Sequence, residues 1–287
     1  MSDPELVTAE LLRDWALPDP GGSKQARGRV VVVGGAAGTP GGVALAGMAA
    51  LRVGAGHVQL AVAESAAPSL AAGFPEAGVI GLPQTGSGSV AGRAAATASA
   101  EAVGSADAVL IGPGLDDADE AAALLEHLLP AVAHDAAVVL DAYSLGVLPD
   151  TQDRFAERLT SSVLTPNVSE LSRLLGRDCD GDLADVAEAA ERYACCVTAQ
   201  GIIADRGSQA WRVPLGHAGL ATAGSGDVLA GLVVGLLARG AEPAQGACWG
   251  TYLHAMAGER LASAVGAVGF LARELVDETP RILAELD

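Results

Sequence analysis

In the sequence Thr222-Ala223-Gly224-Ser225-Gly226-Asp227-Val228-Leu229-Ala230-Gly231, a glycine-rich turn leads into the most apolar helix that we expect in this chain of 287 residues. The glycines let the backbone approach a ligand closely, and the free N–H groups at a helix start attract anions. Asp227 opens the expected helix, where the helix N-terminus favours its ionised form. Such a carboxylate can accept a proton from a bound hydroxyl, although Asp at a helix start also serves as a simple N-cap.

Strands and helices alternate along the rest of the chain. Runs of aliphatic residues without polar alternation predict buried strands at 29–33, 58–63, 107–111, 136–140, 162–164 and 195–198. Helices are predicted at 42–53, 120–129, 169–175, 184–193, 227–238 and 244–264, and residues 202–205 with 210–213 resemble a hairpin. This alternation is typical of βαβ units, so we predict an α/β fold with a mainly parallel sheet and helices on both faces.

The domain organisation predicted from the sequence is simple. Residues 1–28 are interpreted as an N-terminal lead-in and residues 29–287 as one domain, because no linker or internal repeat divides them. The longest strongly apolar run, Val228–Ala238, is shorter than the roughly 20 residues that span a bilayer, and the acidic N-terminus does not resemble a secretory signal. The four cysteines form no C-x-x-C pair. We therefore expect a cytoplasmic protein without a membrane partner.

The formal net charge of −18 limits the partners that this protein can bind. A protein this acidic repels nucleic acid, so we expect no nucleic-acid binding. A small phosphorylated ligand stays compatible with the charge if backbone N–H groups, a divalent cation and a few local Arg or Lys side chains hold it.

Several motifs together resemble a known family. Gly-Ser-Gly-Asp before a buried helix resembles the anion hole and catalytic Asp of ribokinase-like enzymes, and the longer sequence resembles the ADP-dependent NAD(P)H-hydrate dehydratases. The matching segments keep their order and spacing from about residue 24 to 265: Gly34-Gly35 with Pro40-Gly41, 50–56, Ile111–Leu115, Leu140–Ala142, Leu164–Pro166 with Glu170, and 222–231. The resemblance implies a single-domain, ribokinase-like three-layer sandwich.

The resemblance also implies a reaction and a set of site residues. The family restores NADH or NADPH from its hydrate: the hydrate hydroxyl attacks the terminal phosphate of ADP, with help from Mg²⁺, and loss of phosphate re-forms the double bond. Asp227 would be the catalytic base, and Gly224, Ser225 and Gly226 the anion hole. The substrate-binding positions would be Gly42, Gly112, Gly114, Asn167 and Asp227, and the nucleotide-binding positions Gln200, Gly201, Ile202, Ile203, Ala204 and Gly226. No spacing in the sequence indicates a protein metal ligand, and the resemblance implies a homo-oligomer, which an Ala- and Gly-rich helix such as 244–264 would suit.

The chain departs from the family pattern around this site. Asn167 replaces the His of His-Pro-Gly-Glu, Gln200 replaces the Lys of the nucleotide loop, and Tyr143 replaces the second Asp of Asp-Ala-Asp-x-Leu. Asn cannot titrate near pH 7, and the lost Lys removes a cation that would meet phosphate. The departures indicate an altered substrate or nucleotide, weakened use of ADP, or loss of activity.

Other interpretations of the sequence stay open. A ribokinase-like kinase for a small vitamin precursor would use the same Gly-x-Gly-Asp, and a non-catalytic nucleotide-binding paralogue would explain the lost Lys and His. A dinucleotide-binding fingerprint at 34–38 with Glu64 fits the required spacing poorly. Asp141 at a strand end lies where α/β proteins bind ligands, or caps a turn. His217 either faces the site or is a loop histidine, and His254 is expected in the core or an interface.

Overall fold

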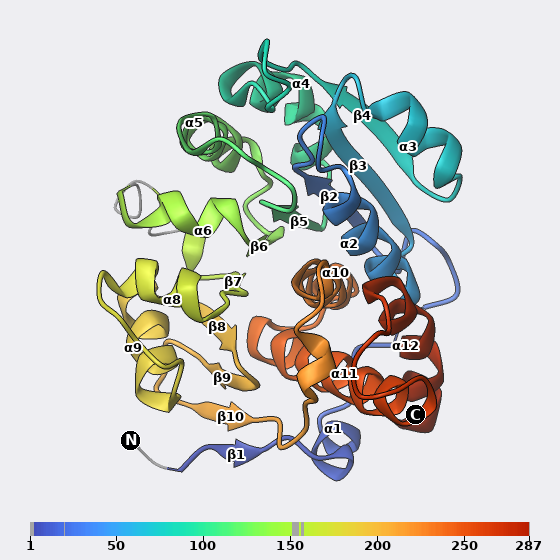
Figure 1. Ribbon diagram of the computed structural model, residues 1–287, viewed down its shortest axis with the longest axis vertical. Helices are drawn as coiled ribbons and strands as arrows, with labels where there is room; N and C mark the ends of the chain where they lie inside the picture. The colour runs from blue at the N-terminus through green and yellow to red at the C-terminus, as the bar shows by residue number, and fades with distance from the viewer. Residues whose placement is uncertain (1–2, 20, 151–154, 156–157, 287) are drawn as a thin grey trace.

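Short aliphatic runs form one sheet through the centre of the protein, seen in the computed structural model of Figure 1. The structure describes residues 3–19, 21–150, 155 and 158–286. The ten described strands lie in the order β1-β10-β9-β8-β7-β6-β5-β2-β3-β4, and all pairings are parallel except those of β9 with β8 and β10. Their bounds are β1 (Glu5–Leu6), β2 (Arg29–Val33), β3 (His57–Ala63), β4 (Gly78–Leu82), β5 (Ala108–Ile111), β6 (Ala137–Leu140), β7 (Ser162–Leu164), β8 (Cys196–Ala199), β9 (Ile202–Ala204) and β10 (Ala210–Arg212).

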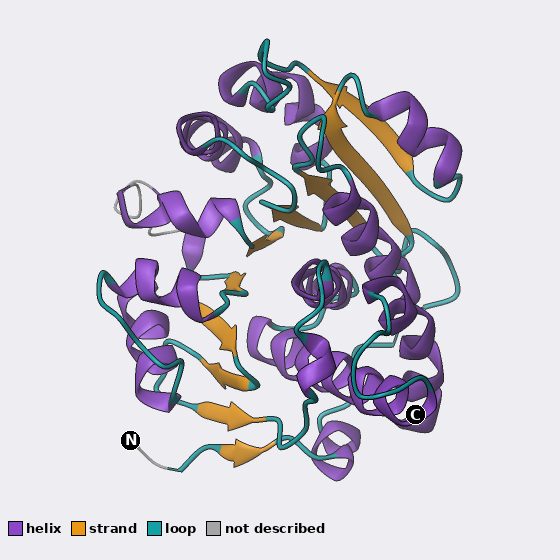
Figure 2. Cartoon of the chain, viewed as in Figure 1, coloured by secondary structure: helices purple, strands orange, loops and turns teal. Residues whose placement is uncertain are grey.

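Helices cover both faces of the sheet, as Figure 2 shows, and each face has its own hydrophobic cluster. One cluster takes residues from α1 (Ala9–Asp14), α2 (Gly41–Arg52), α3 (Ala67–Gly73), α10 (Ser225–Ala238), α11 (Pro243–Ala264) and α12 (Ala272–Leu286). The other takes residues from α4 (Gly92–Gly104), α5 (Ala118–Leu128), α6 (Tyr143–Val147), α8 (Val168–Leu175) and α9 (Leu183–Tyr193). The predicted α/β sandwich with helices on both faces is confirmed.

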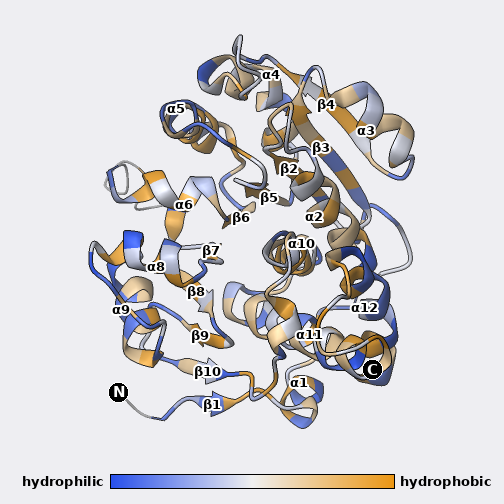
Figure 3. Ribbon diagram, viewed as in Figure 1, coloured by the Kyte–Doolittle hydropathy of each residue, from blue (hydrophilic) through white to orange (hydrophobic). Residues whose placement is uncertain are grey.

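Helix α10 is the most deeply buried helix described, which the apolar sequence from Val228 onward predicts. Figure 3 shows it as a hydrophobic element at the centre of the molecule. It packs so closely on α2 that a Cβ at Gly231 would lie 2.3 Å from the Ala46 carbonyl oxygen, and one at Gly235 would lie 2.7 Å from the Ala50 Cα. Small residues therefore set the separation of the two helices.

The predicted strands and helices are found within one or two residues of their expected bounds, including the hairpin of β9 and β10. The structure also contains β1, β4, α3, α4, α6 and α12, which the sequence patterns did not predict. Helix α4 is Ala-rich with little contrast between its faces, β4 contains two glycines in five residues, and α12 carries Pro280 inside the helix. Weak periodicity and helix-breaking residues conceal such elements, which tertiary packing then stabilises.

The first residues of the chain pack against the rest of the fold. Strand β1 pairs with β10 at the edge of the sheet, and Val7 and Leu12 are fully buried. Trp15 stacks on Trp211 with ring centroids 5.7 Å apart. The segment interpreted as a lead-in thus completes the sheet and one hydrophobic cluster, while the domain boundary at residue 29 stays a prediction.

Helix α11, whose composition would suit an oligomer interface, is buried against other elements of its own chain. Cys248, Trp249 and Leu253 are at most 2% exposed, because α11 packs on α10, α12 and β8. The helix therefore gives no support for an oligomer, and the homo-oligomeric state stays a prediction. In the part of the chain that the structure describes, no helix is long and apolar enough to cross a membrane.

Candidate active site

The N-terminus of α10 lies at the edge of the sheet where the parallel strands end. Gly224 is the N-cap, with φ at 87°, a left-handed conformation that glycine adopts without strain. The helix begins at Ser225, so Asp227 lies inside the first turn, and the cap uses no side-chain hydrogen bond. The interpretation of Asp227 as a simple N-cap is therefore wrong, because its carboxylate is free for another role.

The first turn of α10 presents free backbone N–H groups. Ser225 N donates to the Thr222 carbonyl at 3.2 Å and Val228 N donates to the Gly224 carbonyl at 3.1 Å. Among the described residues, no acceptor takes the N–H of Gly224, Gly226 or Asp227. A helix start with unused N–H groups is suited to bind an anion. The structure thus places Gly224 and Gly226 as the predicted anion hole requires, whereas the N–H of Ser225 is already engaged.

Asp227 faces a glycine of the neighbouring helix. A Cβ at Gly42 would lie 2.8 Å from Asp227 Oδ1, so only glycine leaves space in front of this carboxylate. Burial, and then the negative charge of Glu170, raise the pKa of Asp227 to about 6. The helix N-terminus alone led us to expect a fully ionised group. With a pKa near 6 the carboxylate is still mostly ionised at pH 7, and it suits a general base near neutral pH.

A second buried carboxylate, Asp141, follows strand β6 and lies close to Asp227. Thr165 Oγ1 donates to Asp141 Oδ1 at 2.7 Å, and Asp141 is 5% exposed. Burial raises the pKa of Asp141 to about 7, and the charges of Asp227 and Glu170 add to the effect although the Thr165 hydrogen bond opposes it. The pKa of Glu170 is raised as well, mainly by burial. Perturbed carboxylates that gather in one place are typical of functional sites.

Asn167 is the N-cap of α8 and forms a capping box with Glu170. Glu170 N donates to Asn167 Oδ1 at 3.0 Å, and Asn167 N donates to Glu170 Oε2 at 2.9 Å. The Asn that replaces the family's His therefore uses its carbonyl oxygen to hold the helix start. Its amide nitrogen stays available to a ligand.

A cavity of about 640 Å³ brings several predicted residues together. It is lined by Thr165, Pro166, Asn167, Thr198, Ala199, Gln200, Gly201, Leu215, Gly216, His217, Ala218, Leu220, Ala221, Gly226, Leu229, Thr251, His254 and Ala255. The lining joins the N-terminus of α10, the N-cap of α8 and the turn between β8 and β9. Its volume suits a nucleotide, and its lining contains neither Lys nor Arg.

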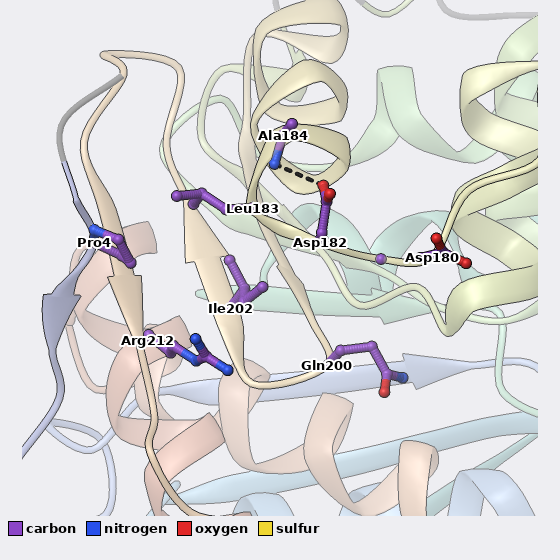
Figure 4. A pocket seen from close by; sticks show the side chains of 9 residues that line it. Pro4, Asp180, Asp182, Leu183, Ala184, Gln200, Ile202 and Arg212 are labelled. Atoms are coloured by element: carbon purple, nitrogen blue, oxygen red, sulfur yellow. Dashed lines mark hydrogen bonds between the residues drawn. The ribbon is translucent and has the colours of Figure 1, made fainter.

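Only some of the predicted nucleotide-binding residues lie at this cavity, and the others are part of the sheet. Gln200 and Gly201 have φ of 50° and 76°, which fits a two-residue hairpin turn between β8 and β9. Ile203 and Ala204 are at most 1% exposed within strand β9, so their side chains do not reach the cavity. Figure 4 shows Ile202 on a separate cavity of about 610 Å³, which Gln200 also borders together with Arg212.

Two glycines predicted to bind substrate lie where two backbone segments approach each other closely. A Cβ at Gly112 would lie 1.8 Å from the Asp141 carbonyl oxygen, and one at Gly114 would lie 2.2 Å from the Thr39 carbonyl oxygen. Gly35 N donates to the Pro113 carbonyl at 2.8 Å. The glycine-rich turn at 34–38 thus packs on the segment after β5, which accounts for its glycines without a dinucleotide fingerprint.

His254 of α11 holds the start of α10. Its Nε2 lies 3.0 Å from the Ser225 carbonyl oxygen and 2.8 Å from Ser225 Oγ. A carbonyl can only accept, so Nε2 carries the proton, and burial lowers the pKa of His254 to about 4, which keeps the ring neutral at pH 7. His254 thus belongs to the support of the site. We missed this role because α10 and α11 meet only in the folded chain.

His217 lines the large cavity and also accepts a hydrogen bond from Gly219 N at 3.1 Å. His217 is thus a loop histidine that also faces the cavity.

For Asp141, the sequence left open whether it binds a ligand or caps a turn. Its position at the end of a parallel strand was the only feature that pointed to the site.

No group of three or more His, Cys, Asp or Glu side chains in the described part of the chain could hold a metal ion by itself.

Comparison with known proteins agrees with this geometry. The sequence profile of a family described as NAD(P)H-hydrate dehydratase matches residues 30–281. An ADP-dependent (S)-NAD(P)H-hydrate dehydratase of Xanthomonas campestris is 42% identical over 288 aligned positions, which cover 98% of this chain and 96% of that protein. A bifunctional NAD(P)H-hydrate repair enzyme of Escherichia coli is 32% identical, and the chain spans 52% of its length.

Solved structures extend the comparison to the fold. An ADP/ATP-dependent NAD(P)H-hydrate dehydratase of Bacillus subtilis, co-crystallised with ATP and Mg²⁺, is 25% identical with a TM-score of 0.78, and each chain is covered fully. A ribokinase-like superfamily protein of Enterococcus faecalis has a TM-score of 0.83 at 23% identity, over 100% of this chain and 97% of that one, and it shows the fold. The chain therefore belongs to the NAD(P)H-hydrate dehydratase family and has its ribokinase-like fold.

Proposed function

We propose that this protein converts NAD(P)H hydrate back to NAD(P)H at the expense of ADP, with release of AMP and phosphate. The observation that carries the proposal is the first turn of α10, where the Asp227 carboxylate and free N–H groups lie together beside a nucleotide-sized cavity. The cavity holds the ADP, and the space in front of Gly42 and Asp227 receives the nicotinamide hydrate.

Asp227 accepts the proton of the hydrate hydroxyl as its oxygen attacks the terminal phosphate of ADP. The N–H groups of Gly224 and Gly226 then stabilise the negative charge that develops on the transferred phosphoryl group. Asn167 offers its amide nitrogen as a hydrogen-bond donor from the N-cap of α8. AMP leaves as the phosphoryl group is transferred to the hydrate oxygen. Loss of phosphate from that ring carbon, together with a proton from the neighbouring carbon, re-forms the double bond.

The carboxylates near the site fit Mg²⁺, which prefers oxygen ligands and commonly takes one or two carboxylates together with substrate phosphates and water. We propose Glu170 and Asp141 as the residues that would hold it, because both are carboxylates near Asp227 at this edge of the sheet and burial raises the pKa of each. Mg²⁺ would supply neutralisation of phosphate charge.

The test is to incubate the purified protein with NADH hydrate, Mg²⁺ and either ADP or ATP, and to follow absorbance at about 340 nm. We expect a nucleotide-dependent rise in absorbance, and a rate lower by about 10²–10⁴ in Asp227→Asn, because the variant lacks a general base. The melting temperature of Asp227→Asn should not fall below that of the wild type, because the amide avoids the cost of ionising a buried carboxylate. In the wild type, kcat/KM should fall as the pH drops through about 6, where Asp227 becomes protonated.

Other outcomes of this test would select the alternatives. A stable phosphorylated product without recovery of NADH would indicate a small-molecule kinase. No reaction with either nucleotide, together with measurable nucleotide binding, would indicate a non-catalytic paralogue. An unchanged rate in Asp227→Asn would remove Asp227 from the mechanism.

A further inference from the structure

A smaller cavity of about 360 Å³ lies beside the buried carboxylates and shares Glu170 with the proposed Mg²⁺ site. It is lined by Ala118, Ala142, Tyr143, Gly146, Val147, Glu170 and Arg173. These residues come from the segments that follow strands β5, β6 and β7, so the cavity opens at the same edge of the sheet as the active site. Helix α8 contributes to both cavities, with Asn167 at the larger and Glu170 at the smaller.

Glu170 connects this smaller cavity to the reacting groups. Its charge contributes to the raised pKa values of both Asp141 and Asp227, so the cavity lies within electrostatic reach of the catalytic carboxylate. A dinucleotide whose nicotinamide ring is bound at Asp227 has a second nucleoside, joined through phosphates, that needs a place nearby. The large cavity is taken by the phosphate donor, which leaves the smaller one for this half.

Two side chains of the smaller cavity are available to a ligand. Tyr143 is 42% exposed although it is a large aromatic residue, and Arg173 is also exposed. Among the described residues, neither the Tyr143 hydroxyl nor the Arg173 guanidinium has a hydrogen-bond partner. Glu170 lines the same cavity; burial raises its pKa, and the charge of Arg173 opposes that effect. An aromatic ring stacks on a nucleobase, and a guanidinium binds phosphate.

Arg173 provides a positive charge close to the active site of a strongly acidic protein. The protein has a net charge of −18, and the large cavity is lined by neither Lys nor Arg. A ligand with several phosphates therefore meets a guanidinium at Arg173 in the smaller cavity. The family pattern has Asp where this chain has Tyr143, and a carboxylate there would repel phosphate while a Tyr ring would not.

The backbone holds Tyr143 in its place. Ala142 has φ of 51° and ψ of −119°, a conformation that costs a residue with a side chain on the order of 1–3 kcal/mol. Ser144 Oγ donates to the Asp141 carbonyl at 2.9 Å and ties the two ends of this turn together. The turn that carries Asp141 thus also presents Tyr143 at the cavity.

We propose that this cavity binds the adenosine half of the NAD(P)H hydrate, with the adenine base stacked on Tyr143 and a phosphate group bound by Arg173. The proposal rests on the proposed function and names the residues that select a dinucleotide over a mononucleotide. It predicts a specificity that depends on Tyr143, a position at which this chain departs from the family pattern.

The experiment compares the hydrates of NADPH, NADH and reduced nicotinamide mononucleotide as substrates of the full-length protein. Tyr143→Ala should lower kcat/KM for the two dinucleotides roughly 5- to 100-fold more than for the mononucleotide, chiefly through KM, because one base-stacking contact is lost. Tyr143→Phe keeps the ring and should restore the preference. Arg173→Gln should also weaken the dinucleotide preference, and Arg173→Lys should recover part of it.

The matched control is Arg93→Gln, which removes an exposed arginine from α4, away from both cavities. Equal effects of Tyr143→Ala on all three substrates, or none on any, would overturn the proposal. Calorimetric titration with adenosine 2′,5′-bisphosphate, at saturating ADP, measures the subsite without turnover. If no hydrate is converted but Tyr143→Ala still weakens this binding, the dehydratase assignment fails and the adenosine subsite stands. If hydrates are converted and the bisphosphate binds both proteins equally, the subsite fails alone.

Discussion

Single residues at this site owe their properties to burial more than to their position in a helix. The helix N-terminus favours the ionised form of Asp227, yet desolvation raises its pKa to about 6. Asp141 directly precedes the start of α6, and burial nevertheless brings its pKa to about 7. The protein keeps two carboxyl groups in a state where each can gain or lose a proton near neutral pH, which is useful for catalysis and unfavourable for stability.

Asp141→Asn should stabilise the protein at high pH. The pKa of Asp141 is raised in the folded state, so the folded protein binds the proton more tightly than the unfolded chain, and stability falls as pH rises from about 4 through 7. The amide cannot ionise and avoids this loss. We expect the variant to gain up to about 4 kcal/mol over the wild type at pH 8.5, which is the full value of a shift from 3.8 to about 7, and less at pH 5.5.

Urea unfolding of both proteins at the two pH values measures this difference. The matched control is Asp178→Asn, which makes the same change at an exposed aspartate outside the site. A gain in Asp141→Asn that is equal at both pH values would show that Asp141 does not titrate in this range.

At the scale of the element, α10 combines two uses of glycine. Gly231 and Gly235 face α2, where its backbone leaves no space for a methyl group. Gly226 lies on the first turn with nothing within 4 Å of its missing Cβ, and it lines the large cavity. One helix therefore uses glycine for packing in its middle and for ligand approach at its start.

The variants Gly226→Ala and Gly231→Ala should separate these uses. Gly231→Ala should destabilise the protein by about 1–3 kcal/mol or more, because its Cβ would lie 2.3 Å from a backbone oxygen of α2. Gly226→Ala should leave stability unchanged or raise it by up to about 1 kcal/mol, since Ala favours a helix. Its methyl group should nevertheless lower the dehydratase rate at least tenfold by obstructing the phosphoryl group.

Urea unfolding and the absorbance assay together test this pair of variants. Comparable loss of stability in both variants would contradict the division of the helix into a packing part and a binding part. Full activity in Gly226→Ala would place the phosphoryl group elsewhere.

For the whole molecule, the net charge of −18 opposes the binding of ADP. Gln200 lies at the turn between β8 and β9, where the family pattern described above has Lys. Gly181 lies against Gln200, since a Cβ there would be 3.2 Å from Gln200 Cγ. Under the proposed function, nucleotide affinity at this turn would then depend on backbone N–H groups and on Mg²⁺.

Gln200→Lys should strengthen ADP binding about fivefold at low salt, because one exposed charge contact is worth about 1 kcal/mol. The gain should shrink at high ionic strength, which screens the interaction. Titration calorimetry with ADP and Mg²⁺ at two salt concentrations measures both effects. Gln209→Lys adds the same charge at the other end of the hairpin, outside the cavity, and should change the affinity less. Equal gains in both variants would indicate a general charge effect, and no gain would mean that the turn no longer meets the nucleotide.

Local patterns of apolar residues, glycine and a helix start were enough to predict the central strands of the sheet, several helices that pack on it and the motif at Gly224–Asp227, but not β1, β4, α3, α4, α6 or α12. The sequence also indicated that Asn167, Gln200 and Gly226 belong to one site, and the structure places all of these on one cavity. Only the tertiary structure decided that His254 holds Ser225, that Asp141 lies beside Asp227, and that Tyr143 meets Arg173 at a second cavity. These contacts join segments far apart in the chain, and their energies come from burial and charge, which no local pattern records.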